Sequence, residues 1–252
     1  MRDFLRARLR QGMPTLRYPD PTLRLPERFR GLPGVRCEHA ASTSDAELVV
    51  LSDGKPRADL GLCLFSPEES PSLGGGPLEF GGDHRLAGSA REHLLVDGEI
   101  PRVEALEGRM RSLFGRSLRL RSVSAGSCNG CEAELVALSN VVFDLGRFGV
   151  QFVASPRHAD GLVVTGAVSI NMRDALLSTY EAVPEPRLVI AVGACAIAGG
   201  PFRGSPEVAN GVSELLPVDL YVPGCPPHPL TILDGLLRLL GRIESGGKES
   251  SG

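Results

Sequence analysis

The chain has 252 residues, of which 42% are hydrophobic and 23% charged, and this is enough for one large domain with a buried core. Its net charge of -3 at pH 7 gives no reason to expect a nucleic-acid partner. The sequence lacks the continuous apolar stretch of a secretory signal and the roughly 20 apolar residues of a membrane-spanning helix. We therefore expect a cytoplasmic protein in which six cysteines serve metal or redox chemistry.

Residues 1–83 are predicted to form an irregular extension, because Pro, Gly and Arg are frequent and long-range periodicity is weak. Within this extension, residues 66–83 are expected to be loop. The opening residues 1–10 are basic and form a candidate amphipathic helix for docking to a partner.

Residues 84–120 are predicted to hold a linker and an amphipathic helix over 101–116. Pro101 suits the first turn of such a helix. Apolar side chains then recur at helical spacing, as expected for a packing face: Val103, Leu106, Met110, Leu113 and Phe114. The last residues, 244–252, are polar and glycine-rich, and we expect a disordered tail.

Residues 121–243 are predicted to form a compact α/β domain. Continuous apolar runs alternate with helical patterns, which is typical of a parallel sheet covered on both faces. The predicted strands lie within 117–125, 159–168, 187–196 and 219–229, and the predicted helices cover 131–143, 171–183 and 230–243.

Four cysteines follow the predicted strands in loops rich in Gly or Pro: Cys128, Cys131, Cys195 and Cys225. Parallel strands bring such loops to one edge of the sheet, so the four thiols are expected to converge. Thiolates can bind zinc or an iron–sulfur cluster. The wide spacing of the last two cysteines and the proline after Cys225 favour a [4Fe–4S] cluster. Zinc, a thioredoxin-like dithiol and unconnected buried cysteines remain alternatives.

Four stretches carry a resemblance to a known family: GSCNGCEAEL, GRFGVQFVASPRHADGLVVTGAV, AVGACAIAGGPF and VPGCPPHPLTILDGLL. They resemble the small subunit of energy-converting, membrane-associated [NiFe] hydrogenases of the formate hydrogenlyase type, which is similar to the 20 kDa subunit of respiratory complex I. The resemblance covers about residues 118–243. It implies a flavodoxin-like fold and one [4Fe–4S] cluster on Cys128, Cys131, Cys195 and Cys225.

The extension has a resemblance of its own. Residues 5–37 resemble the opening of the ferredoxin-like subunit that accompanies such hydrogenases. A two-cluster ferredoxin needs the run C-x2-C-x2-C-x3-C-P twice, yet only the first cysteine of each run is present, at Cys37 and Cys63. We therefore interpret residues 1–83 as a degenerate ferredoxin-like docking segment that binds no iron.

The resemblance implies a non-catalytic electron-transfer subunit of an oxidoreductase complex. Its expected partners are a hydrogenase large subunit or a complex I 49 kDa-like subunit, together with other iron–sulfur and membrane subunits. Through them the chain is expected to lie on the inner face of the cell membrane. A complex I-like subunit that delivers electrons to quinone, and a zinc-stabilised scaffold, are the alternatives.

Four polar residues near the predicted site have two interpretations each. Glu132 follows the second cysteine and resembles a glutamate at the large-subunit boundary that assists proton movement, or it is a carboxylate favoured by a helix amino terminus. His228 could tune a cluster or begin the last helix. Arg157 and His158 could face a partner or form an ordinary polar loop.

Overall fold

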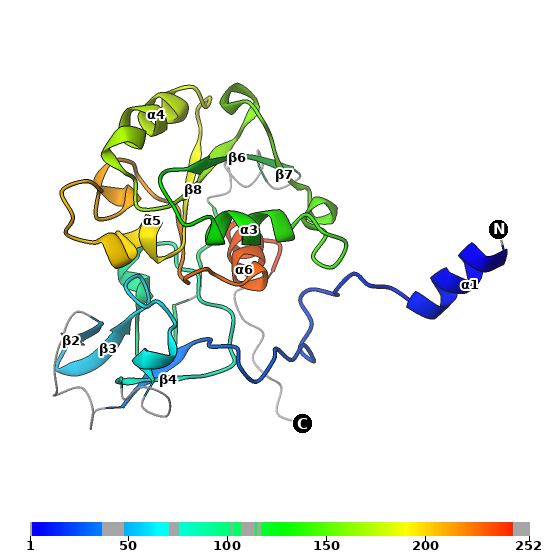
Figure 1. Ribbon diagram of the computed structural model, residues 1–252, viewed down its shortest axis with the longest axis horizontal. Helices are drawn as coiled ribbons and strands as arrows, with labels where there is room; N and C mark the ends of the chain where they lie inside the picture. Colours follow the sequence, from blue (N-terminus) through cyan, green and yellow to red (C-terminus); the bar gives the residue numbers. More distant parts are fainter. Residues whose placement is uncertain are drawn as a thin grey trace.

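A five-stranded parallel sheet forms the centre of the molecule (Figure 1). The structure is a computed structural model that describes residues 2–36, 48–70, 76–101, 103–106, 114 and 117–243. Its strands are β6 (Leu118–Ser124), β7 (Val150–Phe152), β8 (Gly161–Thr165), β9 (Leu188–Val192) and β10 (Leu220–Val222). They lie in the order β10-β9-β8-β6-β7. Counted from β6, this is the flavodoxin-like order 2-1-3-4-5, so the predicted fold is confirmed.

Helices cover both faces of this sheet. They are α3 (Gly130–Ala137), α4 (Ile170–Glu181), α5 (Ala194–Ala198) and α6 (Pro229–Leu239). Alternate residues of a strand point to opposite faces. Accordingly Leu162 and Val164 of β8 share a core cluster with α4 and α5, whereas Val163 packs with α3 and α6. All five residues of β8 and of β9 are buried, as the continuous apolar runs predicted.

Short 3-10 turns fill the connections between these elements. They are η3 (Leu145–Phe148), η4 (Pro156–His158), η5 (Gly200–Phe202) and η6 (Val212–Glu214). The helices α3, α4, α5 and α6 each begin within about eight residues of the strand before them. The carboxyl ends of the strands therefore carry short, well-defined loops at one edge of the sheet.

The extension and the linker that follows it have more regular structure than their composition predicts. Strands β1 (Pro33–Val35) and β4 (Leu78–Phe80) pair antiparallel, and β2 (Val49–Ser52), β3 (Lys55–Asp59) and β5 (Leu95–Val96) form a three-stranded sheet. The turns η1 (Pro67–Glu69) and η2 (Arg91–Leu94) complete it. The prediction of loop over 66–83 is thus wrong at β4. Contacts with the α/β core explain the order, since Leu60, Leu78 and Leu94 are fully buried in a cluster with β8 and α4.

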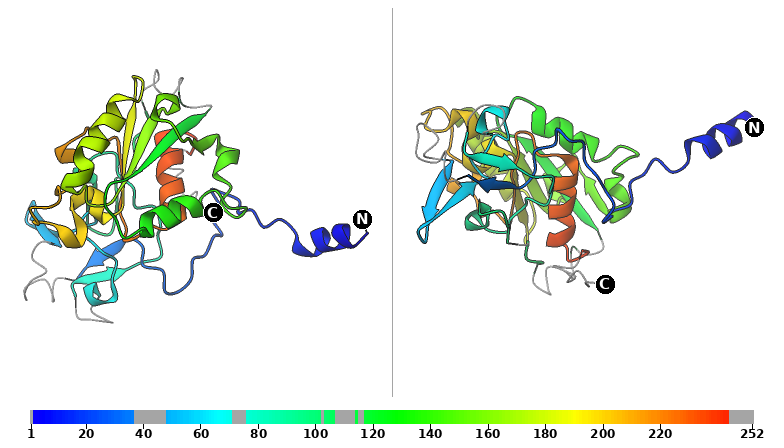
Figure 2. Two further views of the ribbon diagram at one scale, coloured as in Figure 1. Left: turned by 45° about the horizontal axis from the view of Figure 1, so that its top comes forward. Right: turned by 90° about the horizontal axis from the view of Figure 1, so that it is seen from below.

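The predicted amino-terminal helix is present as α1 (Arg2–Gln11). It projects away from the rest of the molecule in every view (Figures 1 and 2). Its Leu5 and Leu9 side chains, four residues apart, are 54% and 82% exposed.

The helix predicted over 101–116 is wrong at its start. Residues 103–106 are not helical. Instead the backbone N–H of Leu106 donates to the carbonyl of Leu239 at 2.9 Å, which ties this segment to the end of α6. Val103 is buried, as predicted, but against the core beside α6. Residues 107–113 and the tail 244–252 lie outside the described residues.

A buried polar network fastens the extension to α6. The Tyr18 hydroxyl donates to Asp234 Oδ1 at 2.6 Å and lies 3.0 Å from His84 Nε2. Arg238 Nε donates to Asp234 Oδ2 at 2.6 Å. Asp234 is only 2% exposed, so its charge is stable there because Arg238 and Tyr18 both bind it. Two segments more than 200 residues apart are joined in this way.

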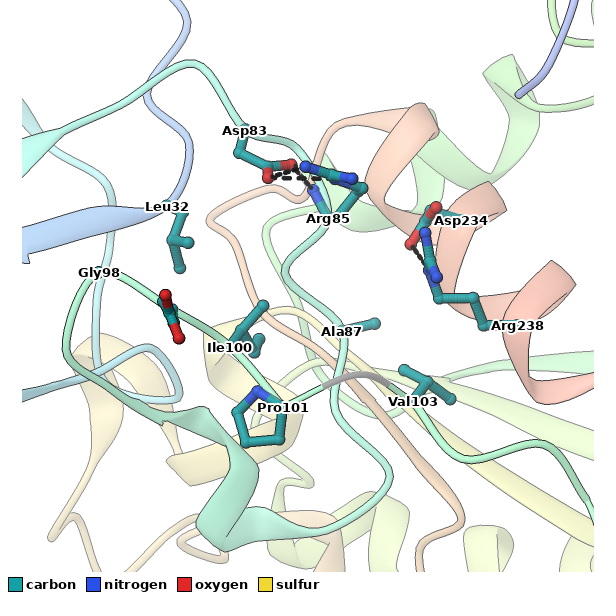
Figure 3. A pocket seen from close by; sticks show the side chains of 11 residues that line it. Leu32, Asp83, Arg85, Ala87, Gly98, Ile100, Pro101, Val103, Asp234 and Arg238 are labelled. Carbon is teal, nitrogen blue, oxygen red and sulfur yellow. Dashed lines mark hydrogen bonds and ion pairs between the residues drawn. The ribbon is translucent and has the colours of Figure 1, made fainter. Parts of the chain in front are cut away.

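A cavity of about 390 Å³ lies beside this network (Figure 3). Two ion pairs provide much of its polar lining: Asp83 with Arg85, and Asp234 with Arg238. The lining residues described by the structure include no cysteine. The cavity therefore belongs to the junction of the extension with α6, not to the predicted metal site.

The network predicts a loss of stability at acid pH. Burial lowers the pKa of His84 below its usual value, although the charges of Asp234 and Asp83 act in the opposite direction. The unfolded chain therefore binds a proton at His84 more readily than the folded chain does. The contribution of neutral His84 to the free energy of unfolding is present above about pH 6.5 and is lost as the pH falls through that value. We expect urea unfolding at pH 7.5 and 5.5 to show a smaller pH dependence for His84→Gln than for the wild type. An equal dependence would contradict this assignment.

Candidate metal centre

The four predicted cysteines lie at the carboxyl ends of three strands. Cys128 lies in the β6–α3 connection and Cys131 in the first turn of α3. Cys195 stands in the first turn of α5 directly after β9, and Cys225 follows β10. Cys131 is buried, Cys195 is half-buried, and Cys128 and Cys225 are exposed. The predicted parallel topology thus brings all four to one edge of the sheet, with two thiols facing outward.

The four thiols are close enough to influence one another electrostatically. Burial raises the pKa of Cys131 to about 12, with further contributions from Glu132 and from the other three thiols. Burial also raises the pKa of Cys195 to about 11, and the neighbouring Cys225 and Cys128 raise it further. Burial therefore disfavours the thiolate forms of Cys131 and Cys195 unless a cation compensates their charge. The site is therefore made of groups that a metal centre would deprotonate and hold together.

Two glycines leave room for the sulfur atoms. A Cβ added to Gly193 would lie 2.5 Å from Cys131 Sγ, and one added to Gly200 would lie 2.7 Å from Cys195 Sγ. Both residues have a positive φ, +91° and +54°, which favours glycine. The backbone therefore approaches two of the four thiols more closely than any side chain would allow.

The donor set fits an iron–sulfur cluster. Such clusters are commonly held by four cysteine thiolates, and the close backbone approach suits a bulky group whose sulfides accept N–H bonds. Among the residues that the structure describes, no three His, Cys, Asp or Glu side chains are grouped tightly enough to hold one metal ion.

Glu132 lies next to the thiols, and hydroxyl groups bind its carboxylate. Its Oε1 accepts from Ser127 Oγ at 2.6 Å and from Thr165 Oγ1 at 2.7 Å. Burial alone would raise the pKa of Glu132, but hydrogen bonds from Ser124, Ser127 and Thr165 outweigh it and lower the pKa. Its Oε2 is buried and has no partner among the described residues. Sequence reasoning missed Thr165, although its place at the end of β8 puts it at the same edge.

His228 begins the last helix. Its Nδ1 accepts from the Leu230 N–H at 3.2 Å, which caps α6. Its ring contacts Phe29 and Phe143 edge-on. Of the two interpretations, the structure bears out helix entry.

Arg157 and His158 are exposed in η4, just before β8 begins. They precede the strand, so they lie at the opposite edge of the sheet from the cysteines. This position supports their interpretation as part of an ordinary polar loop.

The cysteines of the extension stand apart from the four. Cys63 is fully buried and its S–H points to Glu69 Oε2 at 3.5 Å. Cys37 lies outside the described residues. Within the described residues, no helix is long and apolar enough to span a membrane.

Comparisons with known proteins agree with this geometry. The family model "NADH ubiquinone oxidoreductase, 20 Kd subunit" matches residues 128–239, which include all four cysteines. The chain itself is 41% identical, over 58% of its length, to a Pyrococcus furiosus protein named "Probable membrane-bound hydrogenase subunit". The match covers 88% of that protein.

Two further relatives connect the same region to two kinds of complex. Formate hydrogenlyase subunit 7 of Escherichia coli is 40% identical over 56% of this chain and 56% of its own. A subunit of the NADH-quinone oxidoreductase of Heliobacterium modesticaldum is 44% identical over 47% of this chain and 68% of its own. A chain in the structure of an archaeal membrane-bound sulfane sulfur reductase is 32% identical, covering 58% of this chain and 80% of that one with a TM-score of 0.47.

Proposed function

The chain belongs to the family of the 20 kDa subunit of NADH ubiquinone oxidoreductase, and we propose that it is the electron-transfer subunit of a membrane-associated, hydrogenase-like complex. The observation that carries this proposal is the meeting of four thiols from three loops at one sheet edge. In this role the chain makes and breaks no substrate bond.

The proposed resident group is one [4Fe–4S] cluster held by Cys128, Cys131, Cys195 and Cys225. Such a cluster supplies one-electron transfer at a potential set by its surroundings. The chain contributes four soft ligands, the backbone space at Gly193 and Gly200, and partial burial at Cys131. These features favour iron–sulfur over the zinc-stabilised scaffold that remains an alternative.

The open edge of the sheet is the proposed contact surface for a large catalytic subunit. Cys128 and Cys225 are exposed there. Two large hydrophobic side chains that follow β8 and β9, Ile170 and Phe202, are 55% and 51% exposed. Exposed apolar side chains beside a redox site are typical of a subunit interface. Any nickel–iron site would belong to the partner.

The extension is proposed to be a docking segment without iron. It packs on its own α/β domain through Tyr18 and buried leucines, and its helix α1 projects with Leu5 and Leu9 exposed. Other iron–sulfur and membrane subunits are its proposed partners. Through them the chain would reside on the inner face of the cell membrane.

The experiment is affinity purification of the tagged full-length chain from membranes of its own source, followed by identification of the large subunit. A large subunit with two CxxC motifs supports the hydrogenase-like assignment. One without these motifs supports the alternative, a complex I-like subunit that delivers electrons to quinone. Recovery of the chain with no large subunit would contradict both.

A further inference from the structure

One loop of the extension closes around a single carboxylate. Glu69 Oε1 accepts from the Leu64 N–H at 2.8 Å, and Oε2 accepts from the Ser66 N–H at 2.7 Å and from the Cys63 S–H at 3.5 Å. A capping box accounts for the Ser66 bond alone. The additional donors, from Leu64 and Cys63, show that the loop closes on this carboxylate beyond what a capping box requires.

The spacing of this loop is that of a cluster-binding run. Counting C-x2-C-x2-C from Cys63 places the second and third cysteines at Ser66 and Glu69. In such runs the backbone N–H groups bond to cluster sulfurs. Here the N–H groups of Leu64 and Ser66 bond to the Glu69 carboxylate. This carboxylate takes the place that the anionic cluster has in such runs.

This loop adjoins the proposed metal centre. Phe65 and Cys225 line one cavity of about 290 Å³, together with Arg30, whose Nε donates to the Phe65 carbonyl. The Glu69 carboxylate binds the N–H groups of Leu64 and Ser66, on either side of Phe65, so the loop that it closes borders the cavity at Cys225. Arg28 and Glu134 also line the cavity, and they bring one charge of each sign.

We propose that Glu69 sets the reduction potential of the group held by the four cysteines, by keeping a fixed negative charge beside Cys225. Reduction adds an electron to that group, and a nearby carboxylate opposes the addition. Glu69 touches no proposed ligand, so it acts on the centre through the field of its charge and not by coordination. This inference rests on the proposed function, because it requires a redox centre at the four thiols.

The test is a redox titration of the full-length, iron-loaded protein monitored by EPR. Glu69→Gln is expected to move the midpoint to a more positive value, equivalent to an increase of about threefold to tenfold in the equilibrium constant for reduction. Glu68→Gln is the matched control, because Glu68 is its exposed neighbour in η1 and Arg30, not Cys225, is its charged contact.

Glu69→Asp separates charge from packing, since it keeps the carboxylate on a shorter side chain. A midpoint near that of the wild type in this variant supports the inference. A shift in Glu69→Gln no larger than in Glu68→Gln would overturn it. Iron counts for each variant distinguish this failure from that of the proposed function: a wild-type protein that binds no cluster refutes the function itself.

Discussion

Cys195→Ser is expected to abolish iron binding, from about four iron atoms per reconstituted chain to a residual level. Cys195 lies in the first turn of α5, just after the buried strand β9, and Gly200 leaves space beside its sulfur. A serine hydroxyl is a harder ligand and does not deprotonate readily, so one corner of the site would be lost. The same variant should lower the free energy of unfolding of the α/β domain, because metal binding no longer stabilises the loops that carry the cysteines.

Cys63→Ser is the matched control for this experiment. Cys63 is also a buried free cysteine, but its sulfur contacts Glu69 and the Phe65 N–H, not the four thiols. Burial raises the pKa of Cys63 well above its usual value, so it remains a neutral thiol. Its iron content and spectrum should equal those of the wild type. Retention of full iron by Cys195→Ser, or loss of iron by Cys63→Ser, would contradict the assignment of ligands.

Asp234→Ala is expected to lower the free energy of unfolding by about 3–5 kcal/mol. The Asp234 carboxylate is 2% exposed and binds both the Tyr18 hydroxyl and the Arg238 guanidinium. Removing this carboxylate leaves the Tyr18 hydroxyl and the Arg238 guanidinium without their shared buried acceptor. It also removes the hydrogen bond that joins the extension to α6. Urea unfolding of the full-length protein measures the loss.

Two milder variants calibrate that result. Tyr18→Phe removes the hydroxyl that bonds both Asp234 and His84 and should cost about 1–3 kcal/mol. Asp83→Ala removes the other ion pair of the same cavity, which is more exposed, and should cost less than about 1 kcal/mol. A loss in Asp234→Ala no larger than in Asp83→Ala would show that the network does not anchor the extension.

The sequence was sufficient for the α/β domain because its pattern is local. The apolar runs GLVVT and LVIAV are short and rich in β-branched residues, and each ends directly before a glycine, which favours buried strands. Parallel topology then predicts where Cys128, Cys195 and Cys225 lie without any long-range information. The strand β7, of three residues and half-buried, has no comparable signal and was not predicted.

The extension could not be predicted because its order comes from distant contacts. β4 pairs with β1, more than 40 residues earlier, and Leu78 is buried only against the core of the α/β domain. The helix expected from Pro101 fails at its start, where Leu106 bonds to the end of α6 instead. Helical spacing of apolar residues predicts a buried face, and here tertiary contacts decide the local conformation.

The spacing of residues in the sequence could not predict the details of the site either. Glu132, in α3, was singled out, but its partner Thr165 lies 33 residues away at the end of β8. Glu69 is one of the residues that break the ferredoxin run, and only the fold brings its loop to the cavity lined by Cys225.

The central claim is tested most directly by anaerobic reconstitution of the full-length chain, with iron and sulfide counting and EPR of the dithionite-reduced protein. The account predicts about four irons and four sulfides per chain and one S = 1/2 signal. Stoichiometric zinc without iron would contradict it and leave a scaffold. Markedly more iron would contradict the assignment of the extension as a segment that binds none.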